Sequence, residues 1–363
     1  MIYRETGTFI TSYLEDRKLF PIPFDKWAMA VFMLFMVFVV PFIASDYWLA
    51  AHLIPILAYG TAALGLNLLT GMTGQLSLGT AGFMCFGAFF TFNIMLRSPE
   101  WMNLPLAMML AGSVTGVIGI IFGLPSIRIK GFYLLVSTLA AQYFALWFFR
   151  SYPYFLNYAT ATVTLPDHHF DFYGIGDVFG VDMASFEAKY LMSLGVVSAL
   201  ALFAKNLMRS ATGRNFMAVR DMDIAASVIG IPVIRTKMLA FFVSCFYCGV
   251  GGALFCYAYL QVLGIRTFEM NRSFEILFMA IIGGLGSIAG SFYGTVLVYE
   301  FPILFSWAGD YLFGGAFDTA VVDNVAKITY GILIIALLIR EPGGLAALWA
   351  TAKQKLRTWP FPH

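Results

Sequence analysis

KNLMRSATGRNFMAVRDMDIAASVIGIPVIRTK, residues 205–237, is an island of charge between two long apolar segments. It contains six basic residues and only two acidic ones, Asp221 and Asp223. An excess of Lys and Arg holds a short loop on the cytoplasmic side of a membrane. The stretch therefore predicts a cytoplasmic loop between two membrane-spanning helices.

The middle of this loop predicts one short helix. Thr212 or Gly213 begins it, and Gly230 and Pro232 end it, because Gly tolerates the left-handed C-terminal position and Pro cannot continue the helical hydrogen bonds. A compact amphipathic helix within a loop suggests a docking element.

The composition is that of an integral membrane protein. Of the 363 residues, 60% are hydrophobic and 12% are charged, whereas soluble domains have about 25% charged residues. The mean hydropathy is +0.81. The net charge of +2 is too small to favour nucleic acid as a partner. All four cysteines lie in apolar segments, where we expect them to pack as small hydrophobic residues.

The apolar segments predict an all-α polytopic fold of about ten transmembrane helices. A helix needs about 20 residues to cross roughly 30 Å of hydrocarbon. The interval 271–307 is assigned two crossings, because a single one would place Lys353 and Lys355 outside, against the cytoplasmic bias of basic residues. The predicted spans are 27–44, 48–69, 76–96, 104–124, 131–149, 189–207, 238–260, 273–282, 288–307 and 325–339.

These spans predict the organisation of the chain in the inner membrane, with both termini cytoplasmic. The acidic interval 150–187 is expected outside, where His168 and His169 indicate a solvated loop and no metal site. No small-residue cleavage site follows the first apolar run, which argues against a removed signal peptide. The expected parts are a cytoplasmic segment 1–26, a transmembrane domain 27–340 with a periplasmic segment 150–187 and a cytoplasmic loop 205–237, and a cytoplasmic tail 341–363.

Each half of the chain has one glycine-rich interruption, at 71–79 and at 283–290. Broken helices at corresponding positions point to a substrate path, because irregular backbone at membrane depth survives only against protein or a watery cavity. The alternative is tight packing of helices through small residues. The residues predicted to line a path are Asn67, Thr70, Gln75, Ser77, Gly283, Gly284 and Ser287.

The apolar segments offer few charges that could couple transport to an ion gradient. Glu300 is placed near the outer end of its span, and Glu275 at a helix start, where a carboxylate suits the helix dipole. We therefore expect the energy for transport to come from a source outside this chain and not from an ion gradient. A secondary transporter and a membrane-embedded enzyme remain as alternatives. The sequence contains no GxxxxGK[ST] nucleotide-binding loop, so the chain is not expected to be an ATPase itself.

Four stretches, in the same order, resemble LivM-type permeases of branched-chain amino acid ABC importers. The resemblance implies a type II importer fold and ATP-driven import of branched-chain amino acids, with urea, short amides or small carboxylates as alternative substrates. It also implies as partners membrane lipid, a homologous LivH-type permease, two cytoplasmic ATPases that use the ATP, and a periplasmic substrate-binding protein, with no cofactor bound by this chain. The stretches are GLNLLTGMTGQLSLGTAGFMCFGAFF (65–90), IKGFYLLVSTLA (129–140), GRNFMAVRDMDIAASVIGI (213–231) and SFEILFMAIIGGLGSIAGSFYG (273–294).

The cytoplasmic loop resembles the EAA pattern of ABC permeases, EAA followed three residues later by Gly. Here Ile224 stands where the pattern has Glu, with Asp223 just before it. This departure moves the expected docking surface from the carboxylate to the small residues. Arg214 and Arg220 either pair with acidic groups on the ATPase or only retain the loop inside. The coupling residues implied are Arg214, Arg220, Asp223, Ala225, Ala226 and Gly230.

Overall fold

The computed structural model confirms an all-α membrane fold. It describes residues 23–97, 102–124, 132–159, 162–164, 185–313 and 343–358, with residues 324, 325, 328, 329, 331, 332, 335, 336 and 339. Helices form nearly all of this part. The exception is an antiparallel pair of three-residue strands, β1 (Thr162–Thr164) and β2 (Val262–Gly264), in which Val163 faces Leu263.

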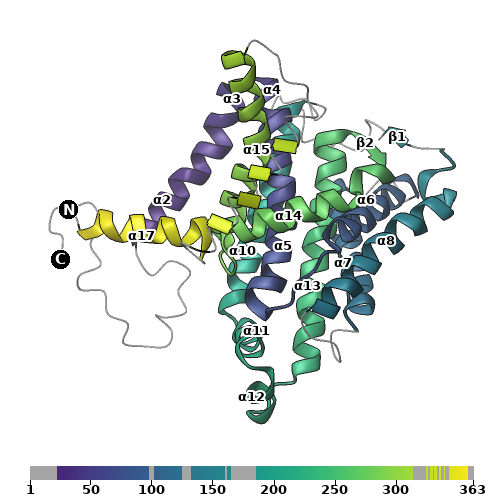
Figure 1. Cartoon of the computed structure of the whole chain (residues 1–363). Coiled ribbons are helices and arrows are strands. Elements are labelled where there is room, and N and C mark those ends of the chain that lie inside the picture. Colours follow the sequence, from purple (N-terminus) through teal and green to yellow (C-terminus); the bar gives the residue numbers. More distant parts are fainter. Residues whose placement is uncertain are drawn as a thin grey trace.

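The first apolar segment lies at the edge of the molecule (Figure 1). It consists of α2 (Pro23–Leu34), the π-helical turn η1 (Phe35–Val39) and α3 (Val40–Ile43). Its side chains are mostly exposed, as Trp27 and Phe42 show, and only 6% of the segment is buried. Its exposed apolar side chains are suited to contact lipid, whereas Met36 lies against α10 (Phe186–Arg209), where its carbonyl oxygen accepts from Tyr190 Oη at 3.2 Å.

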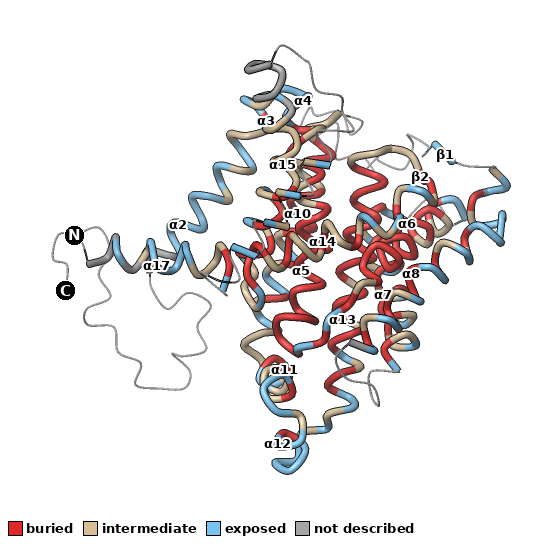
Figure 2. Tube along the Cα trace, in the orientation of Figure 1, coloured by how far each residue is buried: buried red, intermediate tan, exposed pale blue. Residues whose placement is uncertain are grey.

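The centre of the bundle is formed by α5 (Ile54–Thr73), α6 (Thr80–Arg97), α7 (Leu104–Gly123) and α13 (Val233–Leu254). Figure 2 shows α5, α6 and α13 almost wholly buried. The packing is close because small residues face one another: a Cβ added at Gly87 would overlap the backbone of Gly249. The four cysteines are buried in these helices and in the turn that follows α13, as expected.

The remaining elements surround this core. The short helix α4 (Asp46–Trp48) and the π-helical turn η2 (Leu49–Leu53) lead into α5, and a second π-helical turn, η6 (Phe255–Leu260), extends α13. The others are α8 (Phe132–Ser151), the 3-10 turns η4 (Pro153–Leu156) and η7 (Ile265–Phe268), α10 (Phe186–Arg209), α11 (Ala211–Asp221), α12 (Asp223–Val228), α14 (Met270–Gly283), α15 (Ile288–Phe313) and α17 (Gly344–Thr358).

Seven of the described helical segments are long and apolar enough to cross a membrane. The predicted spans at 131–149 and 273–282 correspond to α8 and α14, which are helical but are not among the seven. The last predicted span, 325–339, is described at eight of its fifteen residues, all of them helical, and His168 and His169 lie outside the described residues. The seven segments are Lys26–Ile43, Asp46–Thr73, Thr80–Arg97, Leu104–Gly123, Phe186–Arg209, Val233–Leu260 and Ile288–Phe305.

Candidate translocation path and coupling region

Both glycine-rich interruptions are breaks between helices. The first break follows α5, which ends at Gly74 with a φ of +69°, and the backbone stays non-helical until Thr80. The second break separates α14 from α15, where Gly284 and Gly286 have φ angles of +111° and +84°. Glycine suits these positions because L-residues with a Cβ rarely adopt such angles.

The side chain of Asn67, in α5, joins the two interruptions. Its Nδ2 donates to the carbonyl oxygen of Ser287 and to Ser291 Oγ, each at 2.8 Å. Its Oδ1 accepts from the backbone nitrogen of Gly286 at 2.7 Å. Asn67 is buried, and Gly71, one turn later, is so close to the turn that an added Cβ would overlap the nitrogen of Gly286. The structure thus brings Asn67, Gly284 and Ser287 together.

The other predicted path residues hold the loop after α5. Thr70 Oγ1 donates to the carbonyl oxygen of Gln75 at 3.2 Å, and Ser77 Oγ accepts from the nitrogen of Gly79 at 3.3 Å. The side-chain amide of Gln75 is as buried as these two hydroxyl groups, but it has no hydrogen-bond partner among the described residues. Buried amides are normally paired, so Gln75 is an exception among the described residues of this loop.

The start of α6 is held by two distant helices. Ser273 Oγ, from α14, accepts from the nitrogen of Ala81 at 3.0 Å, and Gln142 Oε1, from α8, accepts from the nitrogen of Gly82. The Nε2 of Gln142 donates to the carbonyl oxygen of Phe268 at 2.6 Å. These contacts satisfy backbone donors that a helix start leaves open. Sequence reasoning did not place Ser273 or Gln142 at this break, although polar residues in apolar helices were a signal.

The single helix predicted in the cytoplasmic loop is wrong, because the loop folds as α11 and α12. Ser210, not Thr212 or Gly213, caps α11, and its Oγ accepts from the nitrogen of Gly213 at 3.3 Å. Met222 is extended, with φ −160° and ψ 99°, and it ends α11 before α12 begins. Helix propensity alone gives no reason for this break. Packing explains the break at Met222, because the break allows Ala226 to turn inward while Asp223 pairs with Lys237 at 3.5 Å.

The predicted coupling residues take up several environments around α12, which projects beyond the end of the bundle (Figures 1 and 2). Ala225 and Arg214 are exposed, Ala226 is buried, and Gly230 has a φ of +88° with open space around it. The surface of α12 and its flanks is apolar and uncovered: Met222, Ile224, Val228 and Ile229 are each 66% or more exposed. We call these four residues the α12 patch.

Arg220 connects the cytoplasmic loop to the broken helix α5. Its Nη1 donates to the carbonyl oxygen of Gly71 at 3.0 Å, and its Nε lies 3.0 Å from Asp221 Oδ1. Gly71 in turn packs against Gly286 in the other interruption. A continuous set of contacts therefore runs from α11 through the end of α5 to the turn between α14 and α15.

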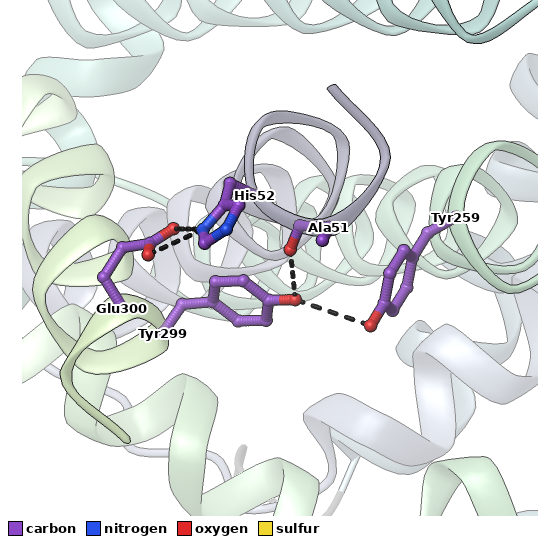
Figure 3. Close-up of polar contacts among 5 residues, drawn as sticks. All are labelled: Ala51, His52, Tyr259, Tyr299 and Glu300. Atoms are coloured by element: carbon purple, nitrogen blue, oxygen red, sulfur yellow. Dashed lines mark hydrogen bonds and ion pairs between the residues drawn. The ribbon is translucent and has the colours of Figure 1, made fainter. Parts of the chain in front are cut away.

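Glu300, one of the few ionisable residues expected in the apolar segments, is paired with His52 in the described bundle. His52 Nδ1 lies 2.9 and 2.8 Å from the two carboxylate oxygens of Glu300, and the side chains are 6% and 17% exposed (Figure 3). Tyr299 Oη donates to the carbonyl oxygen of Ala51 at 2.9 Å and lies 3.5 Å from Tyr259 Oη. Glu300 is thus paired inside the protein rather than directed to the interface.

His52 was not singled out from the sequence, although one histidine in an apolar run was a visible signal. It lies in η2, and Tyr259 lies in η6, so both belong to π-helical turns. Such turns are rare and frequently occur at functional sites.

A second charged pair lies at the start of α14. Arg272 Nη1 and Glu275 Oε2 are 2.8 Å apart. The guanidinium carbon lies 5.3 Å from the ring centre of Tyr59 and 5.6 Å from that of Phe255. Tyr59 also contacts Tyr299, with ring centres 5.8 Å apart. Aromatic rings therefore connect this pair with the region of His52 and Glu300. Sequence reasoning treated Glu275 as a helix-start residue and missed Arg272.

Comparison with known proteins agrees with this architecture. Residues 49–339 match the family described as "Branched-chain amino acid transport system / permease component". The high-affinity branched-chain amino acid transport system permease protein LivM of Salmonella typhimurium is 29% identical over 255 residues, and that of Escherichia coli is 28% identical over 255 residues. Each alignment covers 63% of this chain and 57% of the relative, so the chain spans little more than half the length of these relatives.

A solved structure, PsaBC from Streptococcus pneumoniae in complex with Fab, has a TM-score of 0.42 and 12% identity, over 87% of this chain and 97% of that one. That score is too low to support an inference. The family match covers most of the chain, including α5, both interruptions and the cytoplasmic loop. This multi-pass membrane protein therefore belongs to the family of permease components of branched-chain amino acid transport systems.

Proposed function

We propose that this chain is a permease subunit of an ATP-driven importer of branched-chain amino acids in the inner membrane. The observation that carries the proposal is the contact of Arg220 with Gly71. It joins a cytoplasmic helix directly to the place where two broken membrane helices meet at Asn67. A transport subunit driven from the cytoplasm needs such a connection between its docking element and its path.

The ATP is used by two partner ATPases, and the α12 patch docks in a groove on one of them. Four exposed apolar side chains outside the membrane are unfavourable in water, and such patches mark protein interaction sites. Ala225 and Gly230 contribute small surface next to the patch, and Arg214 contributes an exposed charge. Closure of the ATPases then moves α12 and α11 as a rigid body, and Arg220 carries that movement to Gly71.

The path is completed by a homologous LivH-type permease, and a periplasmic binding protein delivers the substrate. The unpaired amide of Gln75 supports a second subunit or a solute in the path, because either supplies the missing hydrogen-bonding group. Asn67, Thr70, Ser77, Gly283, Gly284 and Ser287 line or support this side of the path. Both termini and the loop 205–237 are cytoplasmic, and the segment 150–187 is periplasmic.

Replacing Val228 by Asp tests the docking. Val228 is 82% exposed, so the substitution leaves the fold intact while placing a charge in the apolar contact. We expect the protein to insert normally and the assembled complex to lose substrate-stimulated ATP hydrolysis. The matched control is Val228→Leu, which keeps the patch apolar and retains activity. Normal stimulation in Val228→Asp contradicts the docking.

One observation favours a second candidate, a gradient-driven secondary transporter. His52 and Glu300 form a buried acid–base pair of the kind that proton-coupled carriers use. Uptake into membrane vesicles separates the two candidates: import that continues without ATP and stops when the proton gradient is dissipated supports the secondary transporter. Import that requires ATP supports the importer. Competition by urea, short amides or small carboxylates identifies the alternative substrates.

A further inference from the structure

We infer that Arg272 and Glu275 form a recognition site for the two charged ends of an α-amino acid. The site rests on the proposed function, because it gives the path a group that selects for amino acids. It is separate from the Asn67 contacts and from the α12 patch, and it lies at the start of α14.

The pair is accessible although its helix is packed. Arg272 and Glu275 are one helical turn apart, and their side chains are 33% and 35% exposed. Ser273, between them in sequence, is 1% exposed and holds the start of α6. The first turns of α14 thus direct one face into the bundle and leave the ion pair on a face that the described residues cover only in part.

The pair lies beside the middle of an apolar segment that is long enough to cross a membrane. Tyr59, whose ring lies below the guanidinium of Arg272, is at the midpoint of the 28-residue apolar segment Asp46–Thr73. Charged groups at such depth are costly and are usually retained for function. A pair that served stability alone gains little over apolar residues of similar volume, because desolvation offsets the attraction.

The chemistry of the pair matches a zwitterion. A guanidinium binds a carboxylate through two parallel N–H groups, and a carboxylate accepts hydrogen bonds from an ammonium. An amino acid that inserts between the two side chains replaces one ion pair with two, and no charge is left unpaired. The rings of Tyr59 and Phe255, with centres 4.7 Å apart, are each 1% exposed and form a buried wall against which the guanidinium lies.

This site distinguishes between substrates. Leucine satisfies both charges, whereas urea satisfies neither, and a simple amine or carboxylate satisfies one and leaves the other unpaired. Unpaired buried charges are strongly unfavourable, so sites of this kind reject analogues that lack one partner group. Arg272 and Glu275 therefore select amino acids in the path itself, in addition to any selection by a binding protein.

The test uses the complex purified from native membranes through a tag on this chain and inserted into nanodiscs. Its melting temperature is measured with L-leucine, with 3-methylbutylamine, which lacks the carboxylate, and with 4-methylpentanoate, which lacks the ammonium. We expect leucine to raise the melting temperature of the wild type and the two analogues at equal concentration to leave it unchanged. Equal stabilisation by either analogue overturns the proposal.

Variants then assign the effect to the pair. Glu275→Gln and Arg272→Gln are expected to lose the leucine shift, and Arg272→Lys, which keeps the charge but not the guanidinium fork, is expected to bind leucine at least tenfold more weakly. The matched control is Glu269→Gln, an exposed carboxylate at the N-cap of α14, which keeps the shift. A leucine shift that persists in Glu275→Gln, or wild-type leucine affinity in the assembled Arg272→Lys complex, overturns the site, and so does loss of the shift in Glu269→Gln.

ATP-driven leucine import in proteoliposomes separates this site from the proposed function. If the wild type imports leucine and Glu275→Gln imports it equally well, the site is wrong and the function stands. If the wild type imports no leucine but shows the zwitterion-dependent shift, the site stands and the function is wrong.

Discussion

Gly71 lies between the turn 284–287 and the side chain of Arg220. It contacts the nitrogen of Gly286 on one side, and its own carbonyl oxygen accepts from Arg220 on the other. Only a residue without a side chain fits between α5 and the turn, because the atoms that a Cβ would meet belong to backbone and cannot rotate away. The sequence identified this glycine as part of an interruption, but not as a contact with the opposite interruption.

Replacing Gly71 by Ala therefore forces α5 and the 284–287 turn apart. We expect destabilisation of about 1–3 kcal/mol, as for other overpacked interiors, measured by thermal unfolding in detergent, together with loss of transport. The control is Gly195→Ala, because nothing lies within 4 Å of a Cβ added there in α10. That substitution is expected to be neutral or stabilising by up to about 1 kcal/mol, since Ala favours helix more than Gly. Equal stability of the two variants contradicts the close approach.

At the level of elements, the contact between α11 and α5 links the loop 205–237 to the break after α5. The sequence predicted Arg220 as a docking residue for an ATPase, with topology retention as the alternative. The structure shows a third environment, a hydrogen bond to the end of a membrane helix. A C-terminal helix end favours such a partner, because its carbonyl groups lack intrahelical donors and carry partial negative charge.

Arg220→Gln tests whether this link transmits movement. The side chain is 40% exposed, so we expect its hydrogen bond to contribute about 0.5–1.5 kcal/mol. This corresponds to a roughly two- to tenfold lower ratio of substrate imported to ATP hydrolysed in proteoliposomes. Arg235→Gln is the matched control, because that side chain is an exposed basic residue of the same loop and belongs neither to the proposed docking surface nor to the contact with Gly71. An equal fall in both variants would indicate a general effect of lost positive charge.

At the level of the whole molecule, the described core confirms the order and type of the membrane helices. The spans predicted at 104–124 and 189–207 correspond closely to α7 and α10. The predicted start at 76 for the third span is four residues early, because α6 begins at Thr80, where Ser273 and Gln142 supply its first hydrogen-bond acceptors. Apolarity continues through the loop before Thr80, so it gives no sign of this boundary.

The orientation of the whole molecule is tested by labelling single cysteines from either side of the membrane. Arg220→Cys and Lys355→Cys are expected to react from the cytoplasmic side, because both positions carry the basic residues that stay inside. The four native cysteines are buried and give a low background. Labelling of the two positions from opposite sides would contradict the count of about ten spans.

The sequence by itself determined the membrane location, the order of the helices, the loop 205–237 between two spans and the two glycine-rich breaks. These follow from local properties: the length of an apolar run, the asymmetry of basic residues and the conformational freedom of glycine. The same local rules placed Glu300 at the membrane interface and Glu275 at an ordinary helix start.

Only the tertiary structure decided which residues of the different helices contact one another. Glu300 pairs with His52 across 248 residues of sequence, and Asn67 binds a turn that is 219 residues away. Arg220 reaches Gly71, and Arg272 lies over Tyr59. The cost of an unpaired polar group at membrane depth makes some partner necessary, but only the packing of α5 against α14 and α15 determines which residue it is.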